Sequence, residues 1–260
     1  MPSYAITGAN RGLGLELVRQ LSVISENIVF ALVRNVEASK ESLAPYVERG
    51  NVHVFKLDLE SPASIRAAVE DIEKVTSSID VLINNAAWVP NRENSAPLGP
   101  GDEKAEKQLF RVNTTGPILT TNAFLPLIQK SKLKKAIVIS SAAGDVDFIL
   151  AASFPYGTEY AISKAAVNVA YAKYAVQFKE EGVLFASISP GMVNTSVKPP
   201  TPEDIAMVQT IVKHFKGANP DFEGPITEYE SASKVLKVIE NLSPETSGQF
   251  VSHHGNKEWL

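Results

Sequence analysis

The sequence contains no cysteine among its 260 residues. A disulfide framework, a redox-active thiol and a thiolate metal site are therefore excluded, and the lack of thiols fits a reducing compartment. Histidine is also scarce, with four residues in the chain. The adjacent pair His253 and His254 would point to opposite sides of a strand, so we expect no metal site there.

Long apolar runs and an excess of positive charge are missing as well. No stretch approaches the roughly 18 apolar residues of a membrane helix. The formal net charge of −4 argues against nucleic acid and anionic membrane as partners. The first apolar run begins at Tyr4 without the basic and long apolar regions of an export signal. We therefore expect a cytoplasmic protein that binds neither membrane nor nucleic acid.

Short apolar runs alternate along the chain with longer amphipathic segments. The runs cover 4–7, 28–33, 52–57, 81–83, 136–140, 183–188 and 249–251, and helical patterns cover 13–22, 61–75, 103–129 and 159–181. The runs are β-branched and almost continuously apolar, as in strands buried on both faces. The alternation predicts one α/β domain over 1–260, built on a doubly wound parallel sheet of about seven strands.

Two segments interrupt this rhythm. The segment 91–101 is rich in proline and glycine, which predicts a loop. The segment 199–225 contains five prolines around an apolar helix near 203–215. It follows the carboxyl end of a strand, where open α/β sheets bind ligands, so we interpret it as a substrate lid. The alternative is a surface subdomain that only covers core.

A glycine turn joins the first strand to the first helix. Gly8, Gly12 and Gly14 leave the backbone free to approach a pyrophosphate, with the helix N-terminus facing the anion. The spacing differs from the Gly-x-Gly-x2-Gly fingerprint, and a tight turn without a ligand is the alternative interpretation. Its position one strand into an α/β pattern favours dinucleotide binding.

Two arginines bear on the choice of coenzyme. Arg11 lies in the glycine turn, and Arg34 directly follows the second strand. An NAD site usually has an acidic residue there, whereas a permanently charged, forked guanidinium suits the 2′-phosphate of NADP. The sequence therefore favours NADP(H), unless both arginines are only solvated surface charges. Asp58 ends the third strand, where it is placed to meet the adenine ring.

Tyr160 is the only one of seven tyrosines with a lysine four residues later, namely Lys164. Four residues on a helix correspond to one turn on the same face. An exposed helical pair is the alternative interpretation. Ser141, at the end of the preceding strand, and the glycine turn favour a site with a chemical role.

These residue types suit the reduction of a carbonyl group. Hydride transfer builds negative charge on the carbonyl oxygen, which must then receive a proton. A phenol has a reference pKa of about 10, and each nearby positive charge can lower it by about 1–3 units. We expect Lys164 to lower the pKa of Tyr160, and Ser141 to donate a hydrogen bond to the same oxygen.

The ordered motifs resemble the short-chain dehydrogenases/reductases over nearly the whole chain. The motifs are Thr7-Gly-x3-Gly-x-Gly14, Asn84-Asn85-Ala86, Asn113, Ser141, Tyr160-x3-Lys164 and Pro190-Gly191. The resemblance implies coenzyme contacts at Gly8, Asn10, Arg11, Gly12, Leu13, Gly14, Arg34, Asp58, Leu59, Asn85, Ala86, Tyr160, Lys164, Pro190, Gly191, Val193 and Thr195. The segment 190–195 would embrace the nicotinamide carboxamide.

The resemblance also implies catalytic roles. Tyr160 would be the proton donor, and Lys164 would hold the nicotinamide ribose and tune Tyr160. Ser141 would orient the substrate carbonyl. Asn113 would kink its helix and hold a water for proton relay.

Within the family, the chain is similar to the C-factor/sniffer-like carbonyl reductases in its segments 163–168 and 113–117 and in Trp259. Two features depart from the family. Ala87 stands where glycine is common, and the interval from Ser141 to Tyr160 is longer than usual. The interval contains Phe148, Ile149, Leu150 and Phe154, which either line a pocket for a bulky substrate or pack beneath the loop. The longer interval argues against the usual tetramer, so we expect a monomer or homodimer.

The sequence thus predicts an NADPH-dependent reductase that acts on a ketone, aldehyde or imine of a hydrophobic small molecule. Two alternatives remain at this stage. One is a coenzyme-bound sensor without turnover, although such proteins typically lose the tyrosine or the lysine. The other is an enzyme that uses the same fold for a step without redox change.

Overall fold

The computed structural model describes residues 1–89, 103–195 and 199–260. The loop predicted at 91–101 lies outside these residues. The strands are β1 (Ser3–Thr7), β2 (Ile28–Val33), β3 (Val52–Lys56), β4 (Val81–Asn84), β5 (Lys135–Ile139), β6 (Leu184–Ser189) and β7 (Phe250–Ser252). The α-helices are α1 (Gly12–Leu21), α2 (Val36–Val47), α3 (Pro62–Glu73), α4 (Glu103–Phe110), α5 (Gly116–Gln129), α6 (Val146–Ala151), α7 (Thr158–Gln177), α8 (Pro202–Ala218) and α9 (Glu228–Glu240).

All seven strands form one parallel sheet in the order β3-β2-β1-β4-β5-β6-β7. Each predicted strand is confirmed, with its ends displaced by at most one residue. The strand order reverses between β1 and β4, and the crevice at that reversal is where such sheets hold ligands. The fold class predicted from the sequence is therefore correct.

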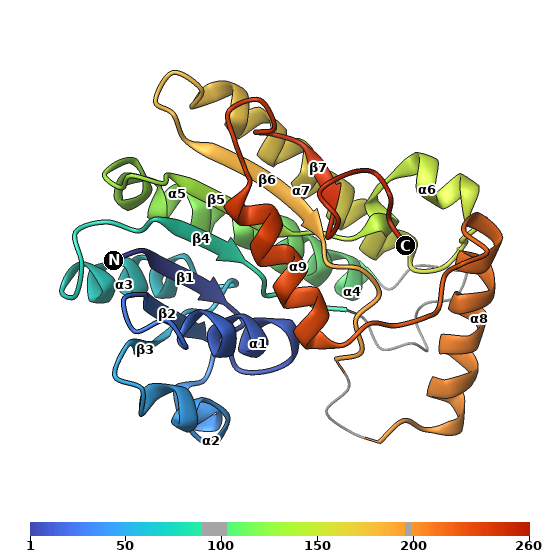
Figure 1. Cartoon of the computed structure of the whole chain (residues 1–260), viewed down its shortest axis with the longest axis horizontal. Helices are drawn as coiled ribbons and strands as arrows, with labels where there is room; N and C mark the ends of the chain where they lie inside the picture. Colours follow the sequence, from blue (N-terminus) through green and yellow to red (C-terminus); the bar gives the residue numbers. More distant parts are fainter. Residues whose placement is uncertain (90–102, 196–198) are drawn as a thin grey trace.

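Two helical layers enclose the sheet (Figure 1). One apolar core joins the sheet to α1, α2 and α9, and a second core joins the opposite face to α3, α5 and α7. α8 and α6 lie away from these layers, at the side of the molecule where the C-terminus ends. These two helices therefore lie outside the two main cores.

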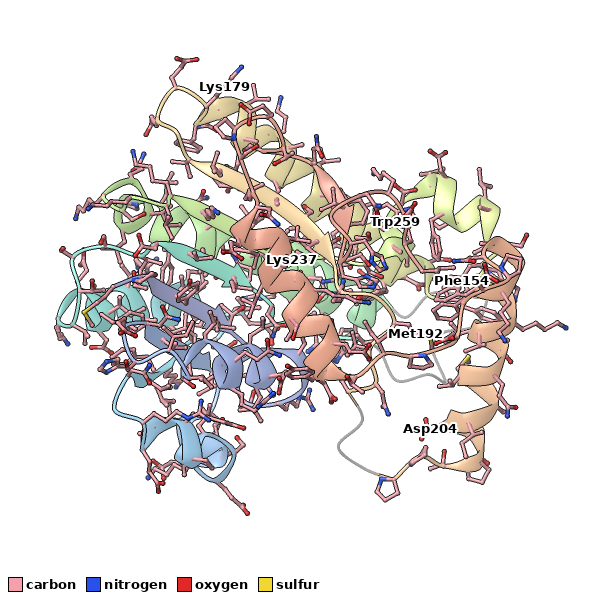
Figure 2. All side chains as sticks on the ribbon, in the orientation of Figure 1. Phe154, Lys179, Met192, Asp204, Lys237 and Trp259 are labelled. Carbon is pink, nitrogen blue, oxygen red and sulfur yellow. The ribbon has the colours of Figure 1, made fainter. Side chains whose placement is uncertain are left out.

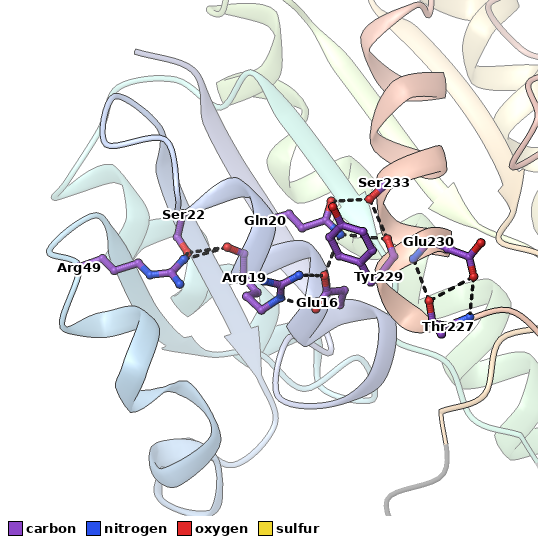
Figure 3. Close-up of polar contacts among 9 residues, drawn as sticks. All are labelled: Glu16, Arg19, Gln20, Ser22, Arg49, Thr227, Tyr229, Glu230 and Ser233. Carbon is purple, nitrogen blue, oxygen red and sulfur yellow. Dashed lines mark hydrogen bonds and ion pairs between the residues drawn. The ribbon is translucent and has the colours of Figure 1, made fainter.

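The helices α1 and α9 pack side by side through polar contacts as well as apolar ones (Figure 3). The amide of Gln20 donates to the carbonyl of Tyr229 at 3.0 Å, and its oxygen accepts from the hydroxyl of Ser233 at 3.1 Å. Thr227 and Glu230 close a capping box at the start of α9. The contacts of Gln20 fix α1 and α9 against each other, although these helices are far apart in sequence.

Three features of the helices differ from the sequence predictions. The predicted helix at 103–129 is divided by a π-helical turn, Arg111–Thr115, and the one at 159–181 ends at Gln177. The sequence analysis did not predict α2, α6 or α9, which are short or carry much polar surface. Within the described residues, no helix combines the length and apolar content that spanning a bilayer requires.

Candidate active site

The glycine turn at the end of β1 is closely packed. Gly8 and Gly12 have φ angles of +66° and +53°, which side chains rarely adopt. A methyl group at Gly14 would lie 2.2 Å from the carbonyl oxygen of Gly8. A methyl group at Gly8 would lie 2.9 Å from the backbone of Ala86. The turn therefore requires glycine at these positions even before a ligand is considered.

We expect Gly14→Ala to lower the free energy of unfolding by about 1–3 kcal/mol, the usual cost of overpacking a rigid site. The matched control is Gly217→Ala in α8, where an added methyl group meets nothing within 4 Å. That control should be neutral or more stable by about 0.5–1 kcal/mol, because alanine favours the helix. Urea unfolding of both variants checks the prediction, and equal stabilities would contradict it.

The residues after β4 brace the glycine turn. The side-chain amide of Asn85 donates to the carbonyls of Thr7 and Gly8, at 3.0 and 3.3 Å. The Thr7 hydroxyl in turn accepts from the backbone N–H groups of Asn85 and Ala86, both at 3.0 Å. The neighbouring Asn84 instead points into the core, where it donates to the hydroxyl of Tyr171 at 2.8 Å. Asn85 thus joins the end of β4 to the end of β1, and Asn84 joins β4 to the helix α7.

The start of α1 is open to an anion. No side chain caps this helix at Arg11, whereas α2, α3, α8 and α9 are capped by asparagine, serine or threonine in the described structure. Its first N–H groups have no partner within the helix and carry the positive end of the helix dipole. The side chain of Leu13 packs into the core, which leaves only the backbone of this residue at the turn. Asn10 completes the turn. This arrangement fits a pyrophosphate.

Arg11 and Arg34 are exposed, and in the described structure neither guanidinium has a hydrogen-bond or ion-pair partner. Both therefore remain free to bind a phosphate group. Asp58 closes a turn after β3, with its carboxylate accepting from the N–H of Glu60 at 3.0 Å. Leu59 is buried and packs against Gly116. The carboxyl ends of β1, β2 and β3 thus supply all the residues predicted for the adenosine half.

The segment 190–195, after β6, is held by residues that the sequence analysis did not identify. Ser231 donates its hydroxyl to the carbonyl of Pro190 at 2.7 Å, and Val193 pairs with Ile226 in a β-bridge. The side chain of Thr195 lies against Gly12, since a methyl group there would be 3.2 Å from the Thr195 Cβ. The predicted carboxamide-binding segment and the glycine turn are therefore in contact.

The prediction that His253 and His254 point apart is wrong. Both residues follow β7 in a turn, and their ring centroids are 4.0 Å apart. His253 is buried against Gly191, and burial together with the charges of its neighbours lowers its pKa to about 4. In the described ranges, no group of three or more His, Asp or Glu side chains could hold a metal ion.

Tyr160 and Lys164 lie one turn apart near the start of α7, as the spacing predicts. The Lys164 ammonium lies 5.7 Å from the centroid of the Tyr160 ring and donates to the carbonyl of Ile139 at 2.8 Å. Ser141, two residues beyond β5, hydrogen-bonds the Tyr160 hydroxyl. The end of β5 and the first turns of α7 therefore bring these three side chains together.

Burial dominates the electrostatics of this group. It raises the pKa of Tyr160 to about 12, although the hydrogen bond from Ser141 lowers it in part. It also lowers the pKa of Lys164 to about 8. The protein chain alone does not confirm the expectation that Lys164 lowers the pKa of Tyr160, because desolvation raises this pKa and Ser141 is the group that opposes the rise. At pH 7 the phenol is neutral and Lys164 is mostly charged.

Asn113 lies at the centre of the π-helical turn between α4 and α5 and is fully buried. Its side chain forms two 2.8 Å hydrogen bonds with the backbone of Trp88, accepting from the N–H and donating to the carbonyl. It also donates to the hydroxyl of Ser163 at 3.3 Å. The interruption of the helix thus lets Asn113 join the segment after β4 to α7.

The interval between Ser141 and Tyr160 forms α6 and a turn. Phe148 is buried in a third apolar cluster with Trp259, and Phe154 and Phe215 pack against it. Leu150 is 71% exposed and faces solvent. The sequence left two interpretations open, a pocket lining or packing beneath the loop. Phe148 packs beneath the loop, whereas Leu150 does neither, because it is exposed.

A family model described as "short chain dehydrogenase" matches residues 3–206. The chain belongs to the short-chain dehydrogenase family. As a member of the family, it is an oxidoreductase of the type that uses nicotinamide coenzymes.

Two fungal relatives match this short-chain dehydrogenase from end to end. It is 40% identical to the short chain dehydrogenase virK of Hypocrea virens and 40% identical to the short-chain dehydrogenase/reductase AacuF of Aspergillus aculeatus. Each comparison covers 100% of both chains.

Two solved structures of carbonyl reductases are similar in fold and sequence. The NADPH-bound carbonyl reductase from chicken fatty liver has a TM-score of 0.79 at 27% identity, and the carbonyl reductase Sniffer of D. melanogaster has 0.81 at 26%. Each comparison covers 98% of both chains. The resemblance to sniffer-like carbonyl reductases stated from the sequence is therefore confirmed.

Proposed function

We propose that this short-chain dehydrogenase uses NADPH to reduce a ketone or aldehyde, or the related imine, on a hydrophobic small molecule. The observation that carries the proposal is the group formed by the half-buried Tyr160 and Ser141 and the buried Lys164 at the carboxyl edge of the sheet. The same edge carries the glycine turn and the segment 190–195 that contacts it. A proton donor and a dinucleotide site therefore share one side of the molecule.

The coenzyme, when bound, supplies the hydride. The chain supplies the proton: Tyr160 donates its phenolic hydrogen to the carbonyl oxygen as charge develops there. Ser141 donates a hydrogen bond to the same oxygen and orients the substrate. Lys164 holds positive charge beside the phenol, which stabilises the phenolate left after transfer. Asn113 keeps the helix interrupted next to this group and ties it to α7.

NADP(H) is preferred over NAD(H) in this proposal. Arg11 and Arg34 are exposed and free of partners in the described structure, and both stand at the edge that receives the adenosine half. A similar structure, the chicken fatty liver carbonyl reductase, is bound to NADPH. A 2′-phosphate would give both guanidinium groups a partner.

We also propose that the segment 199–225 is a lid over the substrate. Its helix α8 is not part of either main core, and it packs on α6 through Phe215 and Phe148, whose ring centroids are 5.2 Å apart. A pure sensor would not require Ser141, Tyr160, Lys164 and Asn113 in one connected arrangement. The arrangement therefore favours turnover over sensing.

The test is to follow NADPH absorbance with a panel of aromatic and aliphatic ketones, aldehydes and cyclic imines. Oxidation of NADPH in proportion to the alcohol or amine formed is the expected result. Coenzyme binding without turnover across the panel would favour the sensor, and conversion of a substrate without net NADPH loss would favour a step without redox change.

The pKa of Lys164 predicts a pH dependence. Because Lys164 is charged below a pKa of about 8, kcat/KM for reduction at saturating NADPH should fall by about tenfold per pH unit above that value. Lys164→Arg keeps the charge at all these pH values, so its residual activity should lose this break. A wild-type rate that stays constant up to pH 9.5 would contradict the assignment.

A further inference from the structure

The segment 256–260 leaves β7 and returns toward the substrate side of the molecule. The N–H of Ser252 donates to the carbonyl of Asn256 at 2.7 Å, which reverses the chain after the strand. Figure 2 shows Trp259 and Phe154 on the side of the molecule that carries α6 and α8. The segment therefore ends beside α6 and the proposed lid helix α8.

Lys257 joins this segment to the start of α6. Its ammonium lies 3.2 Å from a carboxylate oxygen of Asp145, and 5.1 and 4.9 Å from the ring centroids of Phe250 and Trp259. The other carboxylate oxygen of Asp145 accepts from the N–H of Phe148 at 3.0 Å and so caps α6. One carboxylate thus binds both the helix and the returning segment.

Trp259 forms the apolar part of the same connection. It is 8% exposed, and its ring centroid lies 4.5 Å from that of Phe250. It shares an apolar cluster with Ala142 and Phe148. Ala142 directly follows Ser141, and its N–H donates to the hydroxyl of Ser189 at 3.0 Å. The packing of Trp259 therefore reaches the turn that carries the substrate-orienting serine.

The lid helix belongs to this assembly as well. Phe215 of α8 lies 5.2 Å from Phe148 and 5.4 Å from Phe154, measured between ring centroids. His214 of the same helix lies 3.3 Å from the carbonyl of Ala152. The Ser141 turn, α6 and α8 are thus packed into one unit, which we call the substrate wall, and Trp259 and Lys257 join the segment 256–260 to it.

We propose that Trp259 and Lys257 are positioning residues that fix the substrate wall against Tyr160 and thereby set the size of substrate that the enzyme accepts. The inference rests on the proposed reduction of a carbonyl substrate. Neither residue lies at the ends of β1, β2 and β3, where the adenosine half of the coenzyme is expected. Their loss therefore acts on substrate binding and leaves NADPH binding unchanged.

The experiment compares Trp259→Ala, Trp259→Phe and Lys257→Met with wild type on a small and a bulky ketone from the panel. For Trp259→Ala we expect KM for the preferred ketone to rise about tenfold, with kcat and the NADPH Kd within about threefold, and the preference between the two ketones to narrow. Trp259→Phe should restore most of the change, because an aromatic ring still packs on Phe250 and contacts the ammonium. Lys257→Met should shift KM in the same direction by a smaller factor.

Two controls separate positioning from a general loss of stability. Ile72→Ala truncates a fully buried residue of α3 that packs far from the substrate wall. Lys74→Met removes an exposed ion pair with Asp71. Ile72→Ala should lower the stability of the protein, and Lys74→Met should preserve it. Neither variant should change KM or the substrate preference. The proposal is overturned if Trp259→Ala, like Ile72→Ala, leaves KM and the preference between the two ketones unchanged.

A second readout does not depend on turnover. Hydrogen exchange should accelerate at 142–154 and 202–218 in Trp259→Ala and remain unchanged at 12–21. Unchanged exchange at the substrate wall would overturn the inference even if the enzyme proves to be a reductase. If wild type reduces no carbonyl, the proposed function fails, whereas the exchange experiment still decides whether the segment holds the wall. Should Trp259→Ala not fold, Lys257→Met, which alters a largely exposed side chain, provides the same test.

Discussion

Replacing Tyr160 with phenylalanine should abolish carbonyl reduction, lowering kcat by about 10²–10⁴-fold or more, the usual contribution of a positioned proton donor. The variant removes one oxygen atom and keeps the ring that packs beside Lys164. The hydroxyl is neutral at pH 7, since desolvation raises its pKa to about 12, so it holds the proton that the reaction requires. NADPH binding, measured by fluorescence titration, should change by less than about threefold.

Tyr171→Phe is the matched control for this variant. Tyr171 lies on the same helix, is fully buried, and bonds through its hydroxyl with Asn84 and Thr121, both at 2.8 Å. Removing that hydroxyl should cost about 1–3 kcal/mol of stability, because buried polar partners lose a bond, and should leave kcat close to wild type. Retained reduction in Tyr160→Phe would remove this tyrosine from the mechanism, whatever the control shows.

Replacing Arg34 with aspartate should exchange the coenzyme preference. A hydrogen bond to a charged group contributes about 1.5–3 kcal/mol, so loss of the guanidinium should weaken NADPH binding by about 10–150-fold, and repulsion between the new carboxylate and the 2′-phosphate should add to that. NADH carries a ribose hydroxyl in place of the 2′-phosphate, and a carboxylate can accept a hydrogen bond from that hydroxyl. The affinity of the variant for NADH should therefore stay constant or rise. The Kd of each coenzyme, measured by titration at fixed ionic strength, checks this.

Lys179→Asp provides the same change in net charge at a distant place. Lys179 is exposed beyond the end of α7 and lies far from the glycine turn (Figure 2). It should leave both Kd values unchanged, which separates local contact from the overall field of the protein. Equal weakening of NADPH and NADH by Arg34→Asp would show that the arginine supports the fold of the site and does not discriminate between coenzymes.

Much of the fold follows from local sequence patterns. Strands such as β2 (Ile28–Val33) are read directly from β-branched runs, because a strand buried on both faces must be apolar throughout. The sequence analysis missed the helix α9. Its many charged residues and few apolar ones are typical of a loop, and its apolar side is recognised only when it packs on the sheet. The same holds for α6, whose six residues are too short to show a helical period.

The candidate site divides in the same way. The glycine turn, the Tyr160–Lys164 pair and Ser141 are local motifs, and the structure brings the tyrosine, lysine and serine together. Two hydrogen bonds join residues that are far apart in the chain. The Lys164 ammonium donates to the carbonyl of Ile139, and the Ser231 hydroxyl donates to the carbonyl of Pro190. Spacing gives no information on such pairs, because each depends on how separate strands and helices pack.

The sequence by itself determined the parallel sheet, the glycine turn and the spacing of Tyr160 and Lys164, because periodicity and short spacings are properties of neighbouring residues. Only the tertiary structure decided the pKa values of Tyr160 and Lys164, the ion pair of Lys257 with Asp145 and the packing of α6 against α8. The physical reason is that desolvation and pairing depend on which distant atoms fill the space around a group. A chain that has not yet folded leaves all of these groups in water.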